Sequence, residues 1–195
     1  MARIFNSGQI YHSMIKNLII VLFIGLLALI VSCSRPADAL QSEVVPVGEH
    51  IFTRQEVQEM LITNGILTKF ILTDNKYVAA DIKWVEKEYS DKLAKFLFDY
   101  NLHRWTRESS DCDDISRAAA VQASILFHNS KSRPKGVGLL FGEFHYVKTG
   151  VGGHAINIAI VKDKEDYKIV FYEPQLKFLI SASDDERFRT IWGRF

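Results

Sequence analysis

A single cysteine stands among aspartates in the stretch SSDCDDISRA, residues 109–118. A thiol reacts as its thiolate, so it needs a base, a group that orients the base, and donors for a developing oxyanion. We expect Cys112 in the first turn of a helix capped by Ser110 or Asp111. There the helix dipole favours negative charge, and the backbone N–H of Cys112 is itself an oxyanion donor. The stretch therefore predicts a nucleophilic thiol at a helix start.

The expected base is His154, which follows the glycines of GVGG and opens an apolar strand. If HAINIAIV and KIVFYEP form a hairpin, Val161 opposite Lys168 places His154 opposite Gln175, and a register shifted by two places it opposite Glu173. Both registers keep His154, Glu173 and Gln175 on one face of the sheet. A carboxylate on that face accepts a hydrogen bond from one ring nitrogen and so selects the tautomer of the imidazole. The thiol, His154 and Glu173 are thus predicted to form a catalytic triad, with Gln175 as an auxiliary residue.

Three aspartates surround this thiol: Asp111, Asp113 and Asp114. Like charges nearby raise the pKa of a thiol, which opposes its use as a nucleophile. One interpretation is that a single aspartate caps the helix while the others face solvent. The other is that a hard cation neutralises them, and Ca²⁺ suits carboxylate oxygens in a tolerant geometry. We predict Ca²⁺ here, with Asp111 and Asp113 as the first ligands and Asp114 next.

The N-terminus carries an unbroken run of apolar or small residues from Leu18 to Ser32. It is shorter than the roughly 20 residues of a membrane-spanning helix, and it fits the core of a secretory signal preceded by Arg3 and Lys16. The IVSC that ends the run resembles a bacterial lipobox, which implies a diacylated, palmitate-type anchor on Cys33. The alternative is an uncleaved signal anchor.

Charge and cysteine content limit the partners and the compartment. Lys and Arg number 24 against 23 Asp and Glu, so nucleic acid finds no electrostatic attraction. Of the two cysteines, Cys33 is assigned to the lipid, which leaves Cys112 without a disulfide partner, and a lone thiol in an exported protein is flagged as reactive. We expect a lipid-anchored protein of the bacterial cell envelope, on the periplasmic side of the outer membrane in a Gram-negative host.

The chain divides into a signal peptide (1–33), a tether (34–50) and one domain (51–195). In that domain Thr53 and Glu56 predict a capping box ahead of a short helix. Further helices are expected over 82–101, 112–128 and 184–192, and strands over 136–147, 154–161, 168–174 and 176–181. Helices that precede an antiparallel sheet indicate the α+β class.

The motifs DCDD, GHAINIAIV and VFYEPQ together resemble the papain-like and transglutaminase-like cysteine protease superfamily. The resemblance is strongest to the C-terminal calcium-dependent protease domain of Marasmius-type agglutinins, whose sugar-binding trefoil this chain lacks. Bacterial transglutaminase-like proteinases share DCDD and GHA but use aspartate at the position of Glu173.

The resemblance implies a papain-like fold in which N-terminal helices, including the nucleophile helix, pack on an antiparallel sheet. It implies Cys112 as nucleophile, His154 as general base and then acid, and Glu173 as the residue that orients the imidazole. Papain-like enzymes place an oxyanion-hole glutamine shortly before the nucleophile; none stands there in this chain, and Asn101 is the substitute we consider.

These observations predict a membrane-anchored, calcium-dependent cysteine peptidase that acts as a monomer on a protein or peptide substrate. A cell-wall amidase of the NlpC/P60 type is one alternative, because it also joins an Asp-Cys helix start to a strand histidine. A catalytically inactive lipoprotein that binds a partner or a glycan is the other, and its thiol would be inert to alkylating reagents.

Overall fold

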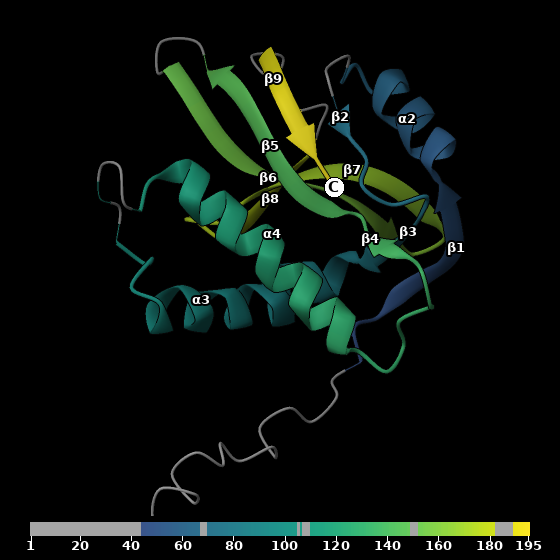
Figure 1. Ribbon diagram of the computed structural model, residues 1–195, viewed down its shortest axis with the longest axis horizontal. Helices are drawn as coiled ribbons and strands as arrows, with labels where there is room; N and C mark the ends of the chain where they lie inside the picture. Colours follow the sequence, from purple (N-terminus) through teal and green to yellow (C-terminus); the bar gives the residue numbers. More distant parts are fainter. Residues whose placement is uncertain (1–43, 67–69, 105, 107–109, 149–151, 182–188) are drawn as a thin grey trace, which may run out of the picture. The chain divides into compact units, whose positions relative to one another are not determined.

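The domain is built on one mixed β-sheet, which we describe from a computed structural model (Figure 1). The structure describes residues 44–66, 70–104, 106, 110–148, 152–181 and 189–195. The predicted signal peptide and its Cys33 lie outside these residues, as does most of the predicted tether. Within the described part of the chain, no helix is both long and apolar enough to cross a membrane.

Nine strands make up the sheet among the described residues. They are β1 (Val47–Thr53), β2 (Phe70–Ile71), β3 (Lys76–Asp81), β4 (Gly138–Leu139), β5 (Phe141–Lys148), β6 (Gly152–Asp163), β7 (Asp166–Glu173), β8 (Phe178–Ser181) and β9 (Arg189–Arg194). The helical segments are α2 (Arg54–Thr63), the π-helix η2 (Trp84–Tyr89), α3 (Ser90–Asp99) and α4 (Cys112–Asn129).

The sheet runs in the order β1-β3-β6-β5-β9-β2, with β7 on β6 and β8 on β7. The pairs β3–β6, β3–β4 and β2–β9 are parallel, and the others are antiparallel. The predicted α+β arrangement, in which N-terminal helices precede a purely antiparallel sheet, is therefore wrong. Strand β1 comes before any described helix, and β3 lies inside the sheet between β1 and β6.

The strands that sequence analysis missed lack a clear period-two pattern. Strand β3 has four consecutive buried residues, Tyr77 to Ala80, because both of its faces are covered. A short run buried on both faces cannot be told from a helix segment by periodicity. At the N-terminus, Val45 is buried and β1 begins at Val47, so residues 45–50 belong to the domain and not to the predicted tether.

The predicted helix over 184–192 is also wrong where the structure describes it. Arg189–Arg194 form β9, which pairs antiparallel with β5 and parallel with β2. Strand β9 gains its hydrogen bonds from segments distant in the chain, so tertiary pairing overrides the local helical preference. In this pairing Gly193 lies close to the ring of Phe70. A Cβ at position 193 would clash with that ring.

Other local predictions are confirmed. Thr53 and Glu56 form the capping box of α2, and α4 begins at Cys112 with Asp111 at the N-cap position. In the hairpin of β6 and β7, Val161 pairs with Lys168, which is the first of the two registers considered from the sequence.

Two apolar clusters fill the two faces of the sheet. Helices α3 and α4 cover one face, with Leu93 and Ala119 packed among residues such as Ala159. Helix α2 covers the other face, where Leu61 joins the cluster that contains Ile158 (Figure 1). Packing in the core therefore holds the start of α4 against β6, and this contact positions Cys112.

Candidate thiol site

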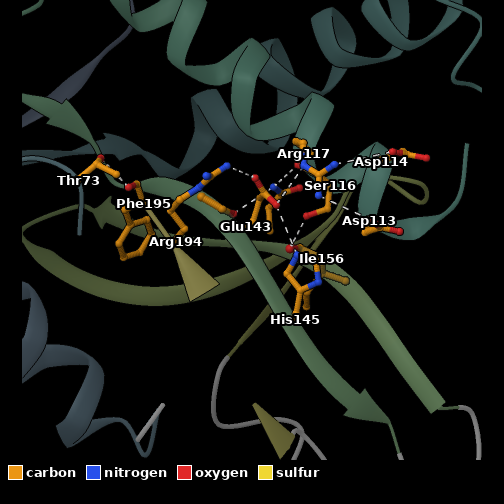
Figure 2. Close-up of polar contacts among 12 residues, drawn as sticks. Thr73, Asp113, Asp114, Ser116, Arg117, Glu143, His145, Ile156, Arg194 and Phe195 are labelled. Atoms are coloured by element: carbon orange, nitrogen blue, oxygen red, sulfur yellow. Dashed lines mark hydrogen bonds and ion pairs between the residues drawn. The ribbon is translucent and has the colours of Figure 1, made fainter. Parts of the chain in front are cut away.

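Hydrogen bonds join the start of α4 to the central strand β6. The Ser116 hydroxyl donates to the carbonyl of Ile156 at 2.7 Å (Figure 2). In return, the Asn157 amide donates to the carbonyl oxygens of Ser116 at 2.8 Å and Gly142 at 3.1 Å. Ser116 and Asn157 are fully buried, so water does not compete for these bonds. The helix start that carries Cys112 is thus held at a defined place beside β6.

The predicted base and its predicted orienting residue are brought together. The Nε2 atom of His154 lies 2.8 Å from Oε2 of Glu173. A carboxylate only accepts hydrogen bonds, so Nε2 carries the proton of the neutral imidazole and Nδ1 is left as an acceptor. The side chains are 22 % and 10 % exposed, so the pair is shielded without being sealed. The backbone N–H of Gln175 donates to the second carboxylate oxygen of Glu173 at 3.3 Å.

Cys112 lies against the strand that carries this histidine. The backbone N–H of Ala155, the residue after His154, donates a hydrogen bond to the thiol. The thiol itself makes no hydrogen bond with the His154 imidazole among the described contacts. Next to the histidine, Gly152 and Gly153 are exposed, and a Cβ on either would meet no described atom within 4 Å. The approach to the imidazole is therefore open on the glycine side.

The electrostatic setting of Cys112 favours the neutral thiol. Burial raises the pKa of Cys112, the N–H of Ala155 lowers it, and the charges of Asp111 and Asp113 raise it further; the net shift is upward. The helix dipole is worth about 1 kcal/mol at most at an exposed site, which is too little to cancel burial and two carboxylates. Proton removal from Cys112 thus requires a base or the neutralisation of the aspartates.

The aspartates form a compact group. Carboxylate oxygens of Asp111, Asp113 and Asp114 lie within 4.8 Å of one another. A hydrogen bond between Asp111 and Asp113 lowers the pKa of Asp111 and raises that of Asp113. One oxygen of Asp111, Oδ1, is buried without a hydrogen-bond partner among the described residues. These oxygens fit a hard cation chemically, because such ions take carboxylate ligands.

The auxiliary residues have other placements. Asn101 follows α3 with φ 63°, a left-handed conformation in which asparagine is common, and its N–H donates to the carbonyl of Phe98. Asn101 therefore ends a helix, and no described contact links its side chain to Cys112. The side chain of Gln175 is exposed and lines a cavity of about 340 Å³ beside the start of α4.

Sequence analysis missed a second ionic cluster, centred on Glu143 of β5. The Glu143 carboxylate accepts from Arg194 at 2.6 Å and lies 3.7 Å from Arg117 and 3.5 Å from His145 (Figure 2). Burial alone would raise the pKa of Glu143, but hydrogen bonds with His145 and Arg194 outweigh burial and lower the pKa. The sequence feature that could have predicted this cluster is a glutamate in the middle of the apolar run GLLFGEFHYV, because a buried charge needs partners.

A cavity near this cluster lies farther along α4, away from the thiol. Its volume is about 600 Å³. Val121, Ile125 and Phe141 supply apolar walls, and Glu143 and Arg194 supply charged groups at one side. Such a mixture of apolar surface and a few convergent polar groups is typical of ligand pockets.

No family model and no curated protein matches the chain. Solved structures do match it. One, titled as a complex of PSL1a with E64, shares 20 % identity at a TM-score of 0.57 over 74 % of this chain and 51 % of that one. Another is Polyporus squamosus lectin bound to the human-type influenza-binding epitope Neu5Aca2-6Galb1-4GlcNAc, with 22 % identity, a TM-score of 0.55 and coverage of 74 % and 49 %. The chain spans about half the length of these proteins and shares their fold.

This comparison contradicts the family prediction. The matching structures are those of a lectin, and neither title names a papain-like or transglutaminase-like protease. By the same finding, the predicted function of a calcium-dependent cysteine peptidase is wrong. Short motifs such as DCDD and GHA report local element types, and a fold can carry them with different functions.

Proposed function

We propose that this chain binds carbohydrate. The observation that carries the proposal is the fold shared over 74 % of the chain with a lectin whose title names a bound sialylated trisaccharide. A glycan thereby replaces the protein or peptide substrate as the proposed partner. The chain spans about half of that lectin, and we propose a binding surface from the cavities of the described residues.

The 600 Å³ cavity beside α4 is the surface that suits a sugar best. Sugar rings present apolar C–H faces and hydroxyl rims, and the cavity offers Val121 and Ile125 next to the charged pair of Glu143 and Arg194. Ser124, His128 and Asn129 add polar groups at the wall formed by α4. Apolar contact with a few directional hydrogen bonds is the pattern of small-ligand recognition.

Binding to an array of immobilised glycans that includes Neu5Aca2-6Galb1-4GlcNAc tests this proposal. The exposed Ser124 is replaced by tryptophan to fill the cavity, and the exposed Ile62 of α2 is replaced by tryptophan as the control. We expect Ser124→Trp to weaken binding about tenfold or more, which corresponds to about 1.4 kcal/mol, and Ile62→Trp to bind as the unmodified chain does. If the unmodified chain binds none of the glycans on the array, the proposal is refuted.

A second function is favoured by a specific observation. His154 lies 2.8 Å from Glu173, and the next residue, Ala155, donates its backbone N–H to the thiol of Cys112. We propose that Cys112 is a reactive thiol centre and that the chain uses it as an enzyme. His154 would accept the thiol proton at Nδ1, and Glu173 would hold the imidazole in that tautomer. The thiolate would then bond to an electrophilic carbon of a bound ligand.

Alkylation followed by mass spectrometry tests the thiol centre. Iodoacetamide should modify Cys112 of the Cys33→Ala chain, and His154→Ala should slow the modification. A thiol that stays unmodified in the folded protein would support the inactive, glycan-binding alternative alone.

The location in the bacterial cell envelope remains a proposal that rests on the sequence around Cys33. Metabolic labelling with an alkyne analogue of palmitate should mark the unmodified chain and leave Cys33→Ala unlabelled. Equal labelling of both chains would remove the lipid anchor.

A further inference from the structure

The cavity of about 340 Å³ at the start of α4 lies between three parts of the chain: the end of α3, the helix start, and the turn from β7 to β8. It is lined by Ala94, Leu97, Leu102, His103, Ile115, Pro174, Gln175, Leu176 and Lys177. Most of these side chains are apolar, and none of the lining residues is acidic. The cavity therefore combines apolar side chains with polar surface and the cationic side chain of Lys177.

The cavity adjoins both halves of the thiol site. Ile115 comes three residues after Cys112, so the two side chains share one side of α4. Pro174 directly follows Glu173, the partner of His154. A ligand seated in the cavity thus lies between the nucleophile helix and the strand end that orients the imidazole.

The walls of the cavity are held in place by hydrogen bonds. The Ser110 hydroxyl donates to the carbonyl of Leu102 at 3.2 Å, which ties one wall to the helix start. On the other side, the N–H of Lys177 donates to the carbonyl of Glu173 at 2.7 Å and closes the turn. Lys177 has φ 59°, so the turn places it in a left-handed conformation that lysine seldom adopts. Both walls are therefore built features of the fold.

An exposed apolar side chain stands at the mouth of this cavity. Leu176 is 68 % exposed, although burial of a leucine side chain is favourable. Next to it, Lys177 supplies the positive charge of the rim, where a carboxylate would be attracted. The apolar surface of the cavity and the positive charge at its edge together favour a ligand that has an apolar group and a negative charge.

We infer that the cavity receives the apolar group of a ligand that also carries a carboxylate, which Lys177 binds at the rim. The inference rests on the proposed thiol centre, since the ligand would present its electrophilic carbon to Cys112. It names the recognition pocket of that centre, which is separate from the larger cavity proposed for carbohydrate.

Chloroacetyl derivatives test this pocket. Their thiol reaction forms an S–C bond, breaks the C–Cl bond and releases chloride, while the thiol proton goes to His154 or to buffer. Mass spectrometry would follow modification of Cys112 in the Cys33→Ala chain by chloroacetyl-leucine, chloroacetyl-leucine amide and chloroacetyl-glycine. We expect chloroacetyl-leucine to react at least about tenfold faster than chloroacetyl-glycine, because burial of its isobutyl group stabilises the bound derivative.

Two variants and one control separate the contributions. Leu176→Asp should abolish the preference for leucine over glycine, and Lys177→Ala should abolish the preference for the free acid over the amide. Ile62→Asp, at an exposed position of α2, should retain both preferences. Iodoacetamide distinguishes the two possible failures. If it leaves Cys112 unmodified, the thiol centre itself is refuted, whereas equal rates for all three derivatives at a thiol that iodoacetamide modifies would refute the pocket alone.

Discussion

Two glutamates on the same sheet each lie beside a histidine, but their surroundings differ. The side chain of Glu143 is 2 % exposed and contacts Arg194 and Arg117 as well as His145. Glu173 is 10 % exposed, and His154 is its one side-chain partner among the described residues. The first carboxylate is neutralised by guanidinium groups, which stay charged at any ordinary pH.

This difference separates a structural cluster from a site that can do chemistry. Around Glu143, His145, Arg194 and Arg117 together stabilise the carboxylate, and the His145 ring stacks on Trp192 with ring centroids 3.9 Å apart. At Glu173, the carboxylate is free to hold one imidazole nitrogen, and the other nitrogen remains available. A histidine next to a carboxylate is thus informative only when the carboxylate lacks stronger partners.

The largest expected effect compares the two histidines. His154→Ala should slow the iodoacetamide reaction of Cys112 at pH 7 about a hundredfold, the usual contribution of a positioned base. His145→Ala should change the rate less than about twofold, since it lies in the arginine cluster and adds no proton acceptor at the thiol. Quenched-flow alkylation read by mass spectrometry measures both rates. If both variants slow the alkylation of Cys112 equally, Glu143 and Glu173 do not differ in role.

A second comparison concerns stability. Glu143→Gln leaves Arg194 and Arg117 without their buried partner and should cost about 3 kcal/mol in the free energy of unfolding. Glu173→Gln keeps a hydrogen-bonding group opposite a neutral imidazole and should cost less than about 1 kcal/mol. Urea denaturation of both variants, followed by circular dichroism, gives the two values. A larger loss in Glu173→Gln would reverse the assignment of structural and chemical roles.

The pH dependence of stability should follow Glu143. Its pKa in the folded state is lowered, so its stabilising contribution is present above its unfolded pKa of about 4.3 and is lost as pH falls through the lower folded pKa. The stability difference between the unmodified chain and Glu143→Gln should therefore be constant near neutral pH and shrink below about pH 4. Denaturation midpoints over this range provide the measurement. A difference that grows on acidification would contradict the sign.

The smallest expected effect concerns the aspartates at the thiol. The charges of Asp111 and Asp113 help to raise the pKa of Cys112, so Asp113→Asn should lower this pKa and speed alkylation at pH 7 about threefold. Above the pKa of the thiol the two chains should react alike. We propose that Ca²⁺ binds to the three carboxylates. It should then speed the alkylation of Cys112 in the unmodified chain by a similar factor and have less effect on Asp113→Asn. Calorimetry that shows no heat with Ca²⁺ would leave the aspartates as surface charges.

Local chemistry in the sequence was enough to predict several elements. The Thr53–Glu56 capping box and the start of α4 at Cys112 depend on residues within one helical turn. The pairing of Val161 with Lys168 depends on a short hairpin turn, and the period of two then places His154 and Glu173 on one face. Contacts between residues close in sequence are specified by those residues alone.

Tertiary structure decided what no short stretch specifies. The parallel pairing of β3 with β6 and of β2 with β9 joins distant segments, so the mixed sheet could not be deduced from local periodicity. The same holds for the cluster around Glu143, whose partners Arg117 and Arg194 come from a helix and from the last strand. Burial in the low-dielectric interior is what turns these separate charges into one cluster, and burial is a property of the whole fold.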